Sequence, residues 1–462
     1  VSRMAPSGLP RVAEVGFGWT GLAFMLTTSL FIGSALGIIT LLYAHRDLSA
    51  LRDGGRGLTL SRQRVAVRGA LVVGQVALAL VLMAGAALMF RSFQNLRSVK
   101  LGFVPDGVST MVIALPSAKY REDERSSAFY EQLQLRLAAV PGIRSASVSS
   151  RIPLIGKEGC TGVMGEGSAG RNGRPEACVT NLQNAPGFFE TIGTTVRGRI
   201  PTWADLRQQS GAVVVTKALA DLLWPGEDAI GKGIRCCSPG PAHYTVVGVA
   251  ENVHDAGLDE PPMQGVYFPL ASIPGARIES RPLYMYLVIR APTMTSAMLT
   301  PIVQRILTEL DPDIPITDSQ SMQDVVARSM AKRTFMLMLL AVAASMALLL
   351  SAVGLYGVIS YVVGQRRNEI GIRMALGASA SDVARMVMRQ SLTFVVAGVV
   401  IGVGAALAST RVLRSLLFEV SPNDPVVLVG VSALLLVLGV VASFAPTRRA
   451  TKVNPIETLR SA

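Results

Sequence analysis

Charged side chains are scarce in this chain. Asp, Glu, Lys and Arg make up 16% of its 462 residues, against roughly 25% in an average soluble domain. The shortage is concentrated in segments without any acidic or basic residue, each long enough to supply the about 20 helical residues that cross a bilayer core. These segments run from Val15 to Ala44, Gly69 to Phe90, Thr334 to Gln365, Gln390 to Thr410 and Pro425 to Thr447. The sequence therefore predicts a membrane protein with about five transmembrane helices.

Other absences narrow the function. A proton- or sodium-driven carrier and a hydrophilic pore usually need a charged residue within the membrane, and none of these segments has one. The net charge is +13, but no basic stripe is interleaved with aromatic residues, so nucleic acid is not a predicted partner. No Ser/His/Asp set, Cys/His nucleophile or carboxylate pair stands out in a catalytic context. We predict no catalytic residue, cofactor or metal ligand, and the chain itself is not expected to be an enzyme.

A long polar region separates the second and third uncharged segments. Val108 to Leu115 and Leu283 to Ile289 read as strands, and each is followed by a stretch with helical spacing, Ser126 to Val140 and Thr293 to Leu310. Strand-like and helix-like pieces also alternate between these two groups. We predict an α+β domain of two lobes, in which an inserted lobe covers about residues 184–275.

Arginines indicate which loops face the cytoplasm. The loops after the first and third segments and the C-terminal tail are rich in arginine, whereas the connector between the fourth and fifth has only Arg411 and Arg414, balanced by Glu419 and Asp424. By the positive-inside rule, the arginine-rich loops and the C-terminus are cytoplasmic. The large polar domain is then expected on the outer side.

Two of the membrane helices are expected to continue beyond the bilayer. The second segment runs on through Arg91 to Leu96 without a helix breaker, and the stretch from Ser319 to Met330 has no Pro or Gly before the third segment begins. This continuity predicts two stalk helices that connect the outer domain rigidly to the membrane helices.

The most specific motif lies in the loop after the third segment. Gln365 to Ala378 reads QRRNEIGIRMALGA, which is typical of a short amphipathic helix. Glu369 precedes Arg373 by one helical turn, the favourable order for an ion pair, and Gly377 is a suitable C-cap. A positive loop that only sets membrane topology is the alternative interpretation of this pattern.

The apolar residues of this motif fall on two faces. Ile370 and Met374 share one face, while Ile372 and Leu376 share another. One face can lie on the membrane helices, which leaves the other for a partner.

The motif directly follows a membrane helix and resembles the coupling-helix signature of the FtsX-like, MacB-type ABC permeases. In that family the helix docks on an ATPase and transmits its motion to the periplasm. Residues 333–462 resemble the three C-terminal membrane helices of the family, and residues 68–330 resemble its first helix and periplasmic domain. The predicted coupling residues are Arg366, Arg367, Asn368, Glu369, Ile370, Gly371, Ile372, Arg373, Met374, Leu376 and Gly377.

The resemblance implies an α-helical membrane protein with a large α+β domain in the periplasm, placed in the inner membrane of a bacterium. It implies the permease subunit of an ABC transporter of the mechanotransmission type, which couples ATP hydrolysis by a separate ATPase to movements of the periplasmic domain during export. The implied partners are that ATPase, membrane lipid, and another permease unit in a dimer or pseudo-dimer. A regulatory membrane protein that activates a periplasmic partner is the main alternative, and a scaffold without an ATPase is a weaker one.

A short internal sequence repeat suggests the domain boundaries. Leu36-Gly-Ile-Ile with its basic exit resembles Leu438-Gly-Val-Val with the basic C-terminal tail. Together with the family resemblance, this repeat predicts that residues 1–67 are the last transmembrane helix and cytoplasmic tail of a preceding permease unit. The rest of that unit is then either missing upstream or truncated in the protein. The remaining predicted parts are a transmembrane and stalk helix (68–98), a MacB-like periplasmic core (99–318) and an FtsX-like permease domain with three transmembrane helices (319–462).

Two motifs are weighed and set aside. Gly226 to Lys232 nearly spells a P-loop, but the next residue is Gly233 where a Ser or Thr would hold magnesium. We predict a surface turn there. His254 and Asp255 lie near Asp259 and Glu260, but the spacing is not that of a metal-ligand set.

Cysteines and glycines give two structural predictions. Cys160, Cys178, Cys236 and Cys237 all fall in the domain placed outside, which suits an oxidising compartment. We predict a disulfide between Cys160 and Cys178, since closing a loop of this size would stabilise the fold by about 3 kcal/mol, and leave Cys236 and Cys237 free or paired elsewhere. In the membrane segments, Gly33 with Gly37 and Gly398 with Gly402 have the spacing that lets helices pack closely.

The predicted topology can be tested by cysteine labelling. In a variant with its native cysteines replaced by serine, we expect Arg367→Cys to react with a membrane-impermeant maleimide only after permeabilisation, because the motif faces the cytoplasm. Ser117→Cys, in the large domain, should react in intact spheroplasts. Labelling of both positions in intact spheroplasts would contradict the predicted orientation.

Overall fold

The computed structural model describes residues 19, 21–31, 33–34, 38, 58–120, 122–155, 161–166, 177–236, 243–255, 257–270, 283–365, 370, 372–374, 376, 378–409 and 417–450. The chain divides into two compact units, each described here by itself. The helical unit comprises Val1–Arg97 and Arg333–Ala462, and the sheet unit comprises Ser98–Lys332.

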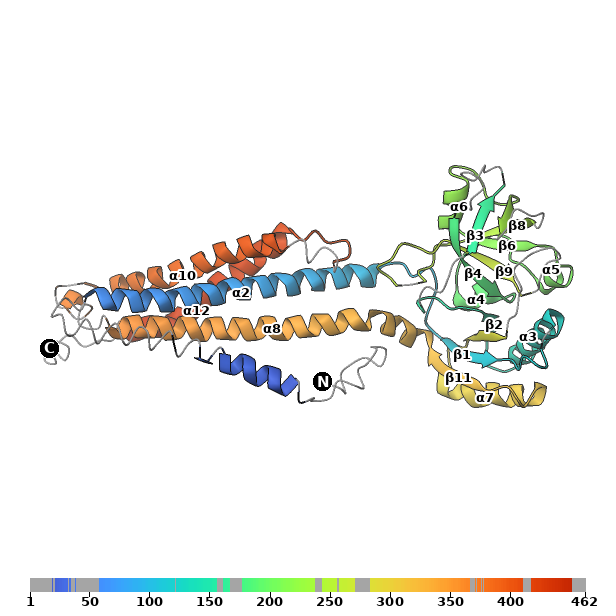
Figure 1. Cartoon of the computed structure of the whole chain (residues 1–462), viewed down its shortest axis with the longest axis horizontal. Helices are drawn as coiled ribbons and strands as arrows, with labels where there is room; N and C mark the ends of the chain where they lie inside the picture. The colour runs from blue at the N-terminus through green and yellow to red at the C-terminus, as the bar shows by residue number, and fades with distance from the viewer. Residues whose placement is uncertain are drawn as a thin grey trace. The chain divides into compact units, whose positions relative to one another are not determined.

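Within the described part of the chain, four helices are long and apolar enough to cross a membrane. They are α2 (Leu58–Ser98), α8 (Met322–Gln365), α10 (Ala380–Ala408) and α12 (Pro425–Ala450), and they lie alongside one another in Figure 1. Most of the first predicted span, Val15 to Ala44, lies outside the described residues. Its described part includes the apolar helix Gly21–Phe31. The predicted count of five spans is therefore not confirmed.

Two helix starts differ from the prediction for the same physical reason. α10 begins at Ala380, well before the uncharged run from Gln390, because Ser379 and Asp382 form a capping box. The predicted stalk helix from Ser319 begins at Met322, since Ser319 to Ser321 belong to a strand, β11 (Ile316–Ser321). The hydroxyl of Ser321 accepts a hydrogen bond from the backbone N–H of Asp324 at 3.1 Å, and this contact starts α8.

The helical unit is apolar both inside and outside. Its core joins Leu80 of α2, Ile359 of α8 and Leu435 of α12, each at most 2% exposed. On the outer surface, Val353 and Val429 are each 68% exposed. A helix that is hydrophobic on all sides is stable when lipid covers its outer face, so this unit is a membrane bundle.

Two glycines bring α10 very close to α2. A Cβ added at Gly398 would lie 2.6 Å from the Cβ of Val76, and one added at Gly402 would lie 3.0 Å from the backbone O of Ala77. The predicted close-packing role of Gly398 and Gly402 is confirmed. Of the other predicted pair, Gly33 and Gly37, the second lies outside the described residues.

The first lobe of the sheet unit is a split β-α-β arrangement. Its elements are β1 (Val108–Ala114), α3 (Asp123–Ala138), β2 (Ser145–Ser149), β10 (Tyr284–Arg290), α7 (Ser296–Leu310) and β11. The strand order is β11-β1-β10-β2, and all neighbours are antiparallel. Met111 of β1 pairs with Leu287 of β10, and both pack against the apolar faces of α3 and α7, which include Leu133 and Val303.

The second lobe is inserted between β2 and β10. Its described elements are β3 (Thr161–Gly165), β4 (Ala177–Asn184), α4 (Phe188–Ile192), β5 (Val196–Gly198), α5 (Trp203–Arg207), β6 (Ala212–Thr216), α6 (Lys217–Leu223), β7 (Gly233–Cys236), β8 (His243–Ala250) and β9 (Gly265–Pro269). The pairing runs β4-β3-β7-β8-β6-β9, and β9 pairs again with β4. This closed ring encloses Val179, Val213 and Val246, each 0% exposed. It includes β3 and most of β4, which precede residue 184 where the lobe was predicted to begin, because the ring cannot close without them.

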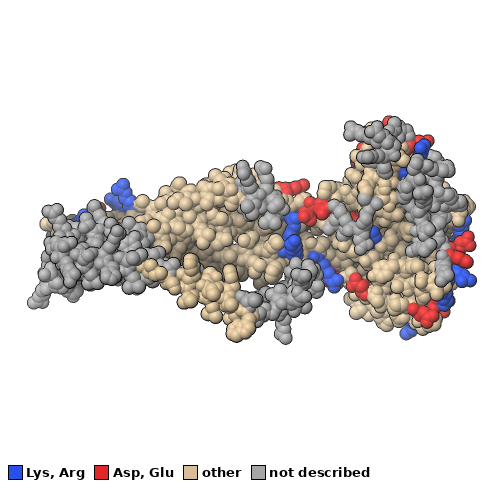
Figure 2. Space-filling view, viewed as in Figure 1, with Lys and Arg blue, Asp and Glu red and all other residues tan. Residues whose placement is uncertain are grey.

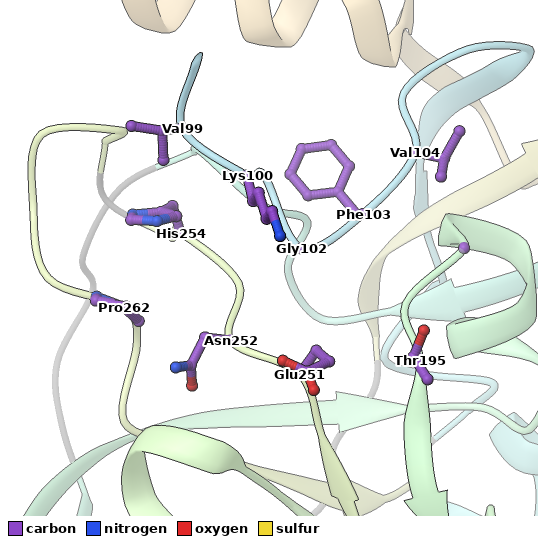
Figure 3. Close-up of a pocket in the computed structure, with 11 residues that line it drawn as sticks. Val99, Lys100, Gly102, Phe103, Val104, Thr195, Glu251, Asn252, His254 and Pro262 are labelled. Carbon is purple, nitrogen blue, oxygen red and sulfur yellow. The ribbon is translucent and has the colours of Figure 1, made fainter. Parts of the chain in front are cut away.

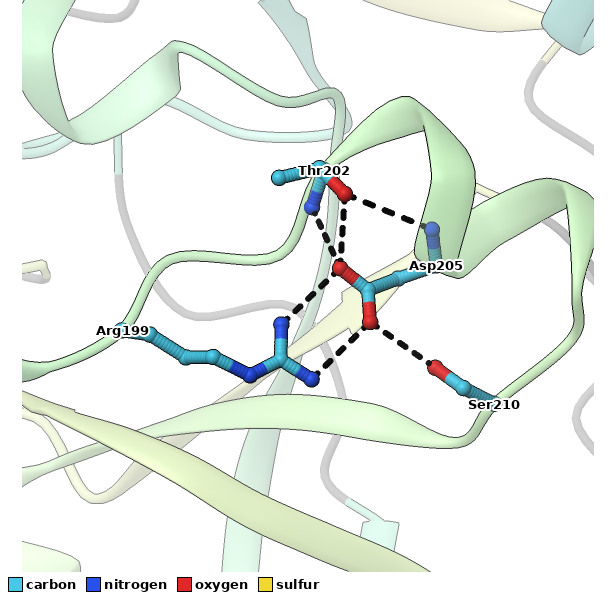
Figure 4. A network of polar contacts seen from close by, with 4 residues as sticks. All are labelled: Arg199, Thr202, Asp205 and Ser210. Carbon is cyan, nitrogen blue, oxygen red and sulfur yellow. Dashed lines mark hydrogen bonds and ion pairs between the residues drawn. The ribbon is translucent and has the colours of Figure 1, made fainter.

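The short helix α5 joins the inserted lobe to α3. Asp205 accepts two hydrogen bonds of 2.9 Å from the Arg199 guanidinium, and Thr202 and Ser210 also donate to it (Figure 4). The Arg199 hydrogen bonds, followed by those of Thr202, hold the pKa of Asp205 well below its usual range, although burial opposes the shift. On the other side, Trp203 Nε1 donates to Gln134 Oε1 of α3 at 2.9 Å. The polar network therefore fixes one lobe against the other.

The α2–α10 contact can be tested with glycine substitutions. We expect Gly398→Ala to destabilise the bundle by about 1–3 kcal/mol, because the added methyl group must displace α2. Gly404→Ala is the matched control on the same helix, since its Cβ would meet nothing within 4 Å. Thermal unfolding of the full chain in detergent measures the difference, and equal melting temperatures for the two variants would show that the close approach does not matter.

Candidate functional site

The predicted coupling segment, residues 366–377, has two differently placed apolar faces. Ile370 is 1% exposed and belongs to the core of the helical unit, and Met374 packs against the same core. Ile372 is 50% exposed and Leu376 is 83% exposed. An isolated apolar side chain on a surface needs no explanation, but two on the same helical face, opposite a buried face, form a surface suited to a partner.

Backbone contacts fix this segment to the start of α10. The Leu376 N–H donates to the Ile372 carbonyl O at 3.0 Å, and the Ala378 N–H donates to the Arg373 carbonyl O at 2.9 Å. Ser379 then begins the capping box of α10. Arg373 Nη1 also lies 3.1 Å from Met386 Sδ, one turn further into α10. The segment is therefore attached to the start of α10 by both backbone and side-chain contacts.

Several predicted site residues lie outside the described residues: Arg366, Arg367, Asn368, Glu369, Gly371 and Gly377. The predicted Glu369–Arg373 ion pair and the Gly377 C-cap stay predictions. Of the predicted disulfide, Cys178 is disulfide-bonded in the structure and lies on β4, while Cys160 is not among the described residues. That pairing also stays a prediction.

The P-loop-like sequence forms a turn of a different kind. Gly226 and Gly231 both have positive φ, Lys232 forms an ion pair with Glu227, and its Nζ lies 5.6 Å from the Trp224 ring. The segment leads into the strand β7, whereas a P-loop leads into a helix whose N-terminus faces the phosphates.

The contacts of His254 and Asp255 are structural. Nδ1 of His254 lies 3.0 Å from the Glu260 carbonyl O, and Asp255 pairs with Arg151 at 3.2 Å. Among the described residues, no group of three or more His, Cys, Asp or Glu is placed to hold a metal ion.

A hollow of about 700 Å³ lies where the chain enters the sheet unit after α2. Figure 3 shows Lys100 and Phe103 on one side of it, with Glu251 and Asn252 on the other. The Asn252 side-chain oxygen accepts a hydrogen bond from the Ala218 N–H at 2.8 Å, so this polar group holds the surrounding chain in place. A Cβ at Gly102, which has a φ of +78°, would lie 2.0 Å from the Asn252 carbonyl O. The entry of the chain into the sheet unit is therefore tightly fixed.

Comparison with known protein families identifies the chain. A family model described as "FtsX-like permease C-terminal" matches residues 341–455, and one described as "MacB-like periplasmic core domain" matches residues 69–304, more than half of the chain. The chain belongs to the MacB/FtsX-like ABC permease family. The four long apolar helices found among the described residues are thus those of a membrane permease, and the sheet unit carries most of its MacB-like core domain.

The relatives include named exporters. The macrolide export ATP-binding/permease protein MacB of Bartonella quintana (strain Toulouse) is 24% identical over 68% of this chain and 47% of its own length. The pyoverdine export ATP-binding/permease protein PvdT of Pseudomonas fluorescens (strain Pf0-1) is 29% identical over 61% of this chain and 42% of its own length. The chain therefore spans about half the length of the curated relatives it matches.

The solved structures with detectable similarity include the periplasmic region of MacB from Actinobacillus actinomycetemcomitans. It is 12% identical, with a TM-score of 0.33, and the match covers 51% of this chain and 95% of that structure.

This MacB/FtsX-like permease also has a polar cluster that the sequence did not predict. At the end of α2, Arg91 forms an ion pair with Asp424, the residue before α12. Next to it, the buried hydroxyl of Ser92 accepts a hydrogen bond from the Phe418 N–H at 2.8 Å. The only signal in the sequence was the balance of basic and acidic residues in the connector between the fourth and fifth uncharged segments. That balance did not reveal that Asp424 pairs with a residue on α2. The cluster ties α2 to the start of α12.

The close packing of Gly102 against Asn252, where the chain enters the sheet unit, can be tested by substitution. We expect Gly102→Ala to destabilise the sheet unit by about 3 kcal/mol, from positive-φ strain and from the clash with Asn252. Gly226→Ala is the control, because Gly226 has the same φ of +78° but open space around it, and it should cost only about 1–2 kcal/mol. Denaturant unfolding of the full chain, followed by tryptophan fluorescence, would separate the two. An equal loss of unfolding free energy in both variants would mean that the chain around Asn252 can shift to accommodate the added methyl group without measurable cost.

Proposed function

We propose that this chain is the permease subunit of an ABC exporter of the mechanotransmission type, in the inner membrane of a bacterium. The observation that carries the proposal is the two-faced segment, with Ile370 buried in the bundle and with Ile372 and Leu376 exposed. The exposed face would bind an ABC ATPase on a partner subunit. The names of the MacB and PvdT relatives combine an ATP-binding and a permease component, which supports such a partner.

The route of the motion follows from the contacts of the segment. Movement of the docked segment would pass to α10 through the Ser379 cap and the Arg373–Met386 contact. From α10 it would pass to α2 at Gly398 and Gly402, where little space is left for independent movement.

Two unbroken helices support transmission beyond the membrane. α8 has 44 residues and α2 has 41, so they are roughly 66 and 62 Å long at 1.5 Å per residue. Both exceed the about 30 Å of a bilayer core. A continuous helix transmits displacement along its axis, whereas a flexible linker would absorb it. ATP-driven closure of the partner would in this way reshape the periplasmic domain and drive export.

The proposal also covers how the permease assembles and where its ATP is hydrolysed. The permease would work as a dimer or pseudo-dimer with another permease unit, and ATP hydrolysis would occur on the partner ATPase rather than on this chain. The names of the relatives give macrolides and pyoverdine as the exported compounds of those proteins, and the substrate of this chain is left open.

The docking face can be tested with a double variant. The full chain is co-purified and reconstituted with the ABC ATPase encoded beside it. We expect Ile372→Ala with Leu376→Ala to lower permease-dependent ATP hydrolysis by about tenfold or more, because burying two large aliphatic side chains in the interface would contribute about 1.5–3 kcal/mol each. Val426→Ala is the control, since Val426 is a similarly exposed apolar residue, 70% exposed, at the start of α12.

The same assay separates export from regulation. Further stimulation of the ATPase by a transported compound would support export, whereas stimulation by a periplasmic protein would favour the regulatory alternative. If the double variant hydrolyses ATP at the wild-type rate, with the complex intact, the segment is not the docking face.

A further inference from the structure

The N-terminal half of α10 carries a groove of its own. It has a volume of about 680 Å³. The described residues that line it are Arg385, Met388, Arg389, Leu392, Thr393, Val396 and Ala397. Their spacing of three and four places them on one face of the helix. The two arginines stand at one end of the groove, and the remainder is almost entirely apolar.

The positive charge at this end is only partly neutralised within the described residues. Arg385 is 80% exposed, and its only described acidic neighbour, Asp382, lies 3.6 Å away. Asp382 also accepts hydrogen bonds from the backbone N–H and the hydroxyl of Ser379, and its single negative charge can offset only one of the two arginines. Arg389 is exposed, and no carboxylate of the described chain lies within ion-pair distance of it. Figure 2 shows basic atoms over the N-terminal part of α10 and uncharged surface along the rest of that helix.

The rest of the groove suits a hydrocarbon chain. Leu392, Val396 and Ala397 form its floor. The Thr393 hydroxyl donates to the Arg389 carbonyl O at 2.7 Å, so it leaves no unsatisfied donor in an apolar setting. From Arg389 to Ala397 the helix rises about 12 Å, which is close to the roughly 15 Å of hydrocarbon in one leaflet.

We propose that this groove binds an anionic phospholipid of the cytoplasmic leaflet. The phosphate would be held by Arg385 and Arg389, whose planar guanidinium groups match phosphate oxygens, and an acyl chain would lie along Leu392 and Val396. Charge complementarity selects this occupant, since a neutral apolar partner would leave Arg389 without a counter-charge and a soluble anion would leave the apolar floor bare. The inference depends on the helical unit lying in a membrane with the start of α10 at the cytoplasmic side, and not on the proposed ATPase docking.

The test uses the full chain, purified in detergent and mixed with equimolar phosphatidylglycerol and phosphatidylethanolamine of the same acyl composition. Native mass spectrometry counts the retained lipids. We expect the wild type to retain phosphatidylglycerol in preference by roughly 25-fold, which is about fivefold for each of the two arginines near an anionic headgroup. Arg385→Gln with Arg389→Gln should abolish the preference. Arg448→Gln is the control, because Arg448 is an exposed arginine at the C-terminal end of α12, outside the groove, and it should leave the preference unchanged.

A second measurement does not depend on the charge variants folding well. A phosphatidylglycerol with a photoreactive acyl chain, in vesicles containing the wild-type protein, should cross-link to peptides covering residues 388–397. The matching phosphatidylcholine probe should cross-link there several-fold less. Equal retention of both lipids by the wild type, an equal loss of preference in Arg448→Gln, or cross-linking of this stretch to a second protein chain in place of lipid would each overturn the proposal.

Discussion

The close approach of α10 to α2 at Gly398 and Gly402 is the contact on which the rest of the helical unit depends. α10 directly follows the two-faced segment, and α2 is one of the two longest helices of the described chain. Because side chains at these two positions are reduced to hydrogen, the backbone of one helix contacts the side chains of the other almost directly. Packed interiors transmit displacement because they contain little free volume. A looser α2–α10 contact would let the two helices move independently of each other.

The membrane helices could largely be predicted from the sequence, because a bilayer imposes a simple rule on length and charge. The uncharged runs at Gly69, Thr334 and Pro425 correspond to α2, α8 and α12. The start of α10 was missed because the rule reads only apolar residues. Its first turns contain Asp382, Arg385 and Arg389, and the helix is started there by a capping box. A search for capping pairs upstream of each apolar run would have found it.

The sheet unit shows where sequence patterns stop being informative. The split lobe was predicted well, since its helices have clear apolar faces that pack on long, apolar strands. The inserted ring was predicted to begin too late because β3 and β4 are rich in glycine and polar residues, and only their pairing with β7 and β9 makes them part of a barrel-like core. At the candidate site, the opposite exposures of Ile370 and Leu376 followed from helical periodicity. The Arg91–Asp424 ion pair could not be predicted, because no local pattern in the sequence relates two residues that are so far apart along the chain.

The network around Asp205 has a consequence for a protein whose large domain lies outside the cytoplasm. A carboxyl group whose folded pKa is depressed contributes stability that is present above its unfolded pKa, near 3.9, and is lost only as the pH falls through the folded value. Because Arg199 and Thr202 keep Asp205 ionised far below its usual range, the junction between the two lobes would stay closed during acid exposure that titrates ordinary surface carboxylates.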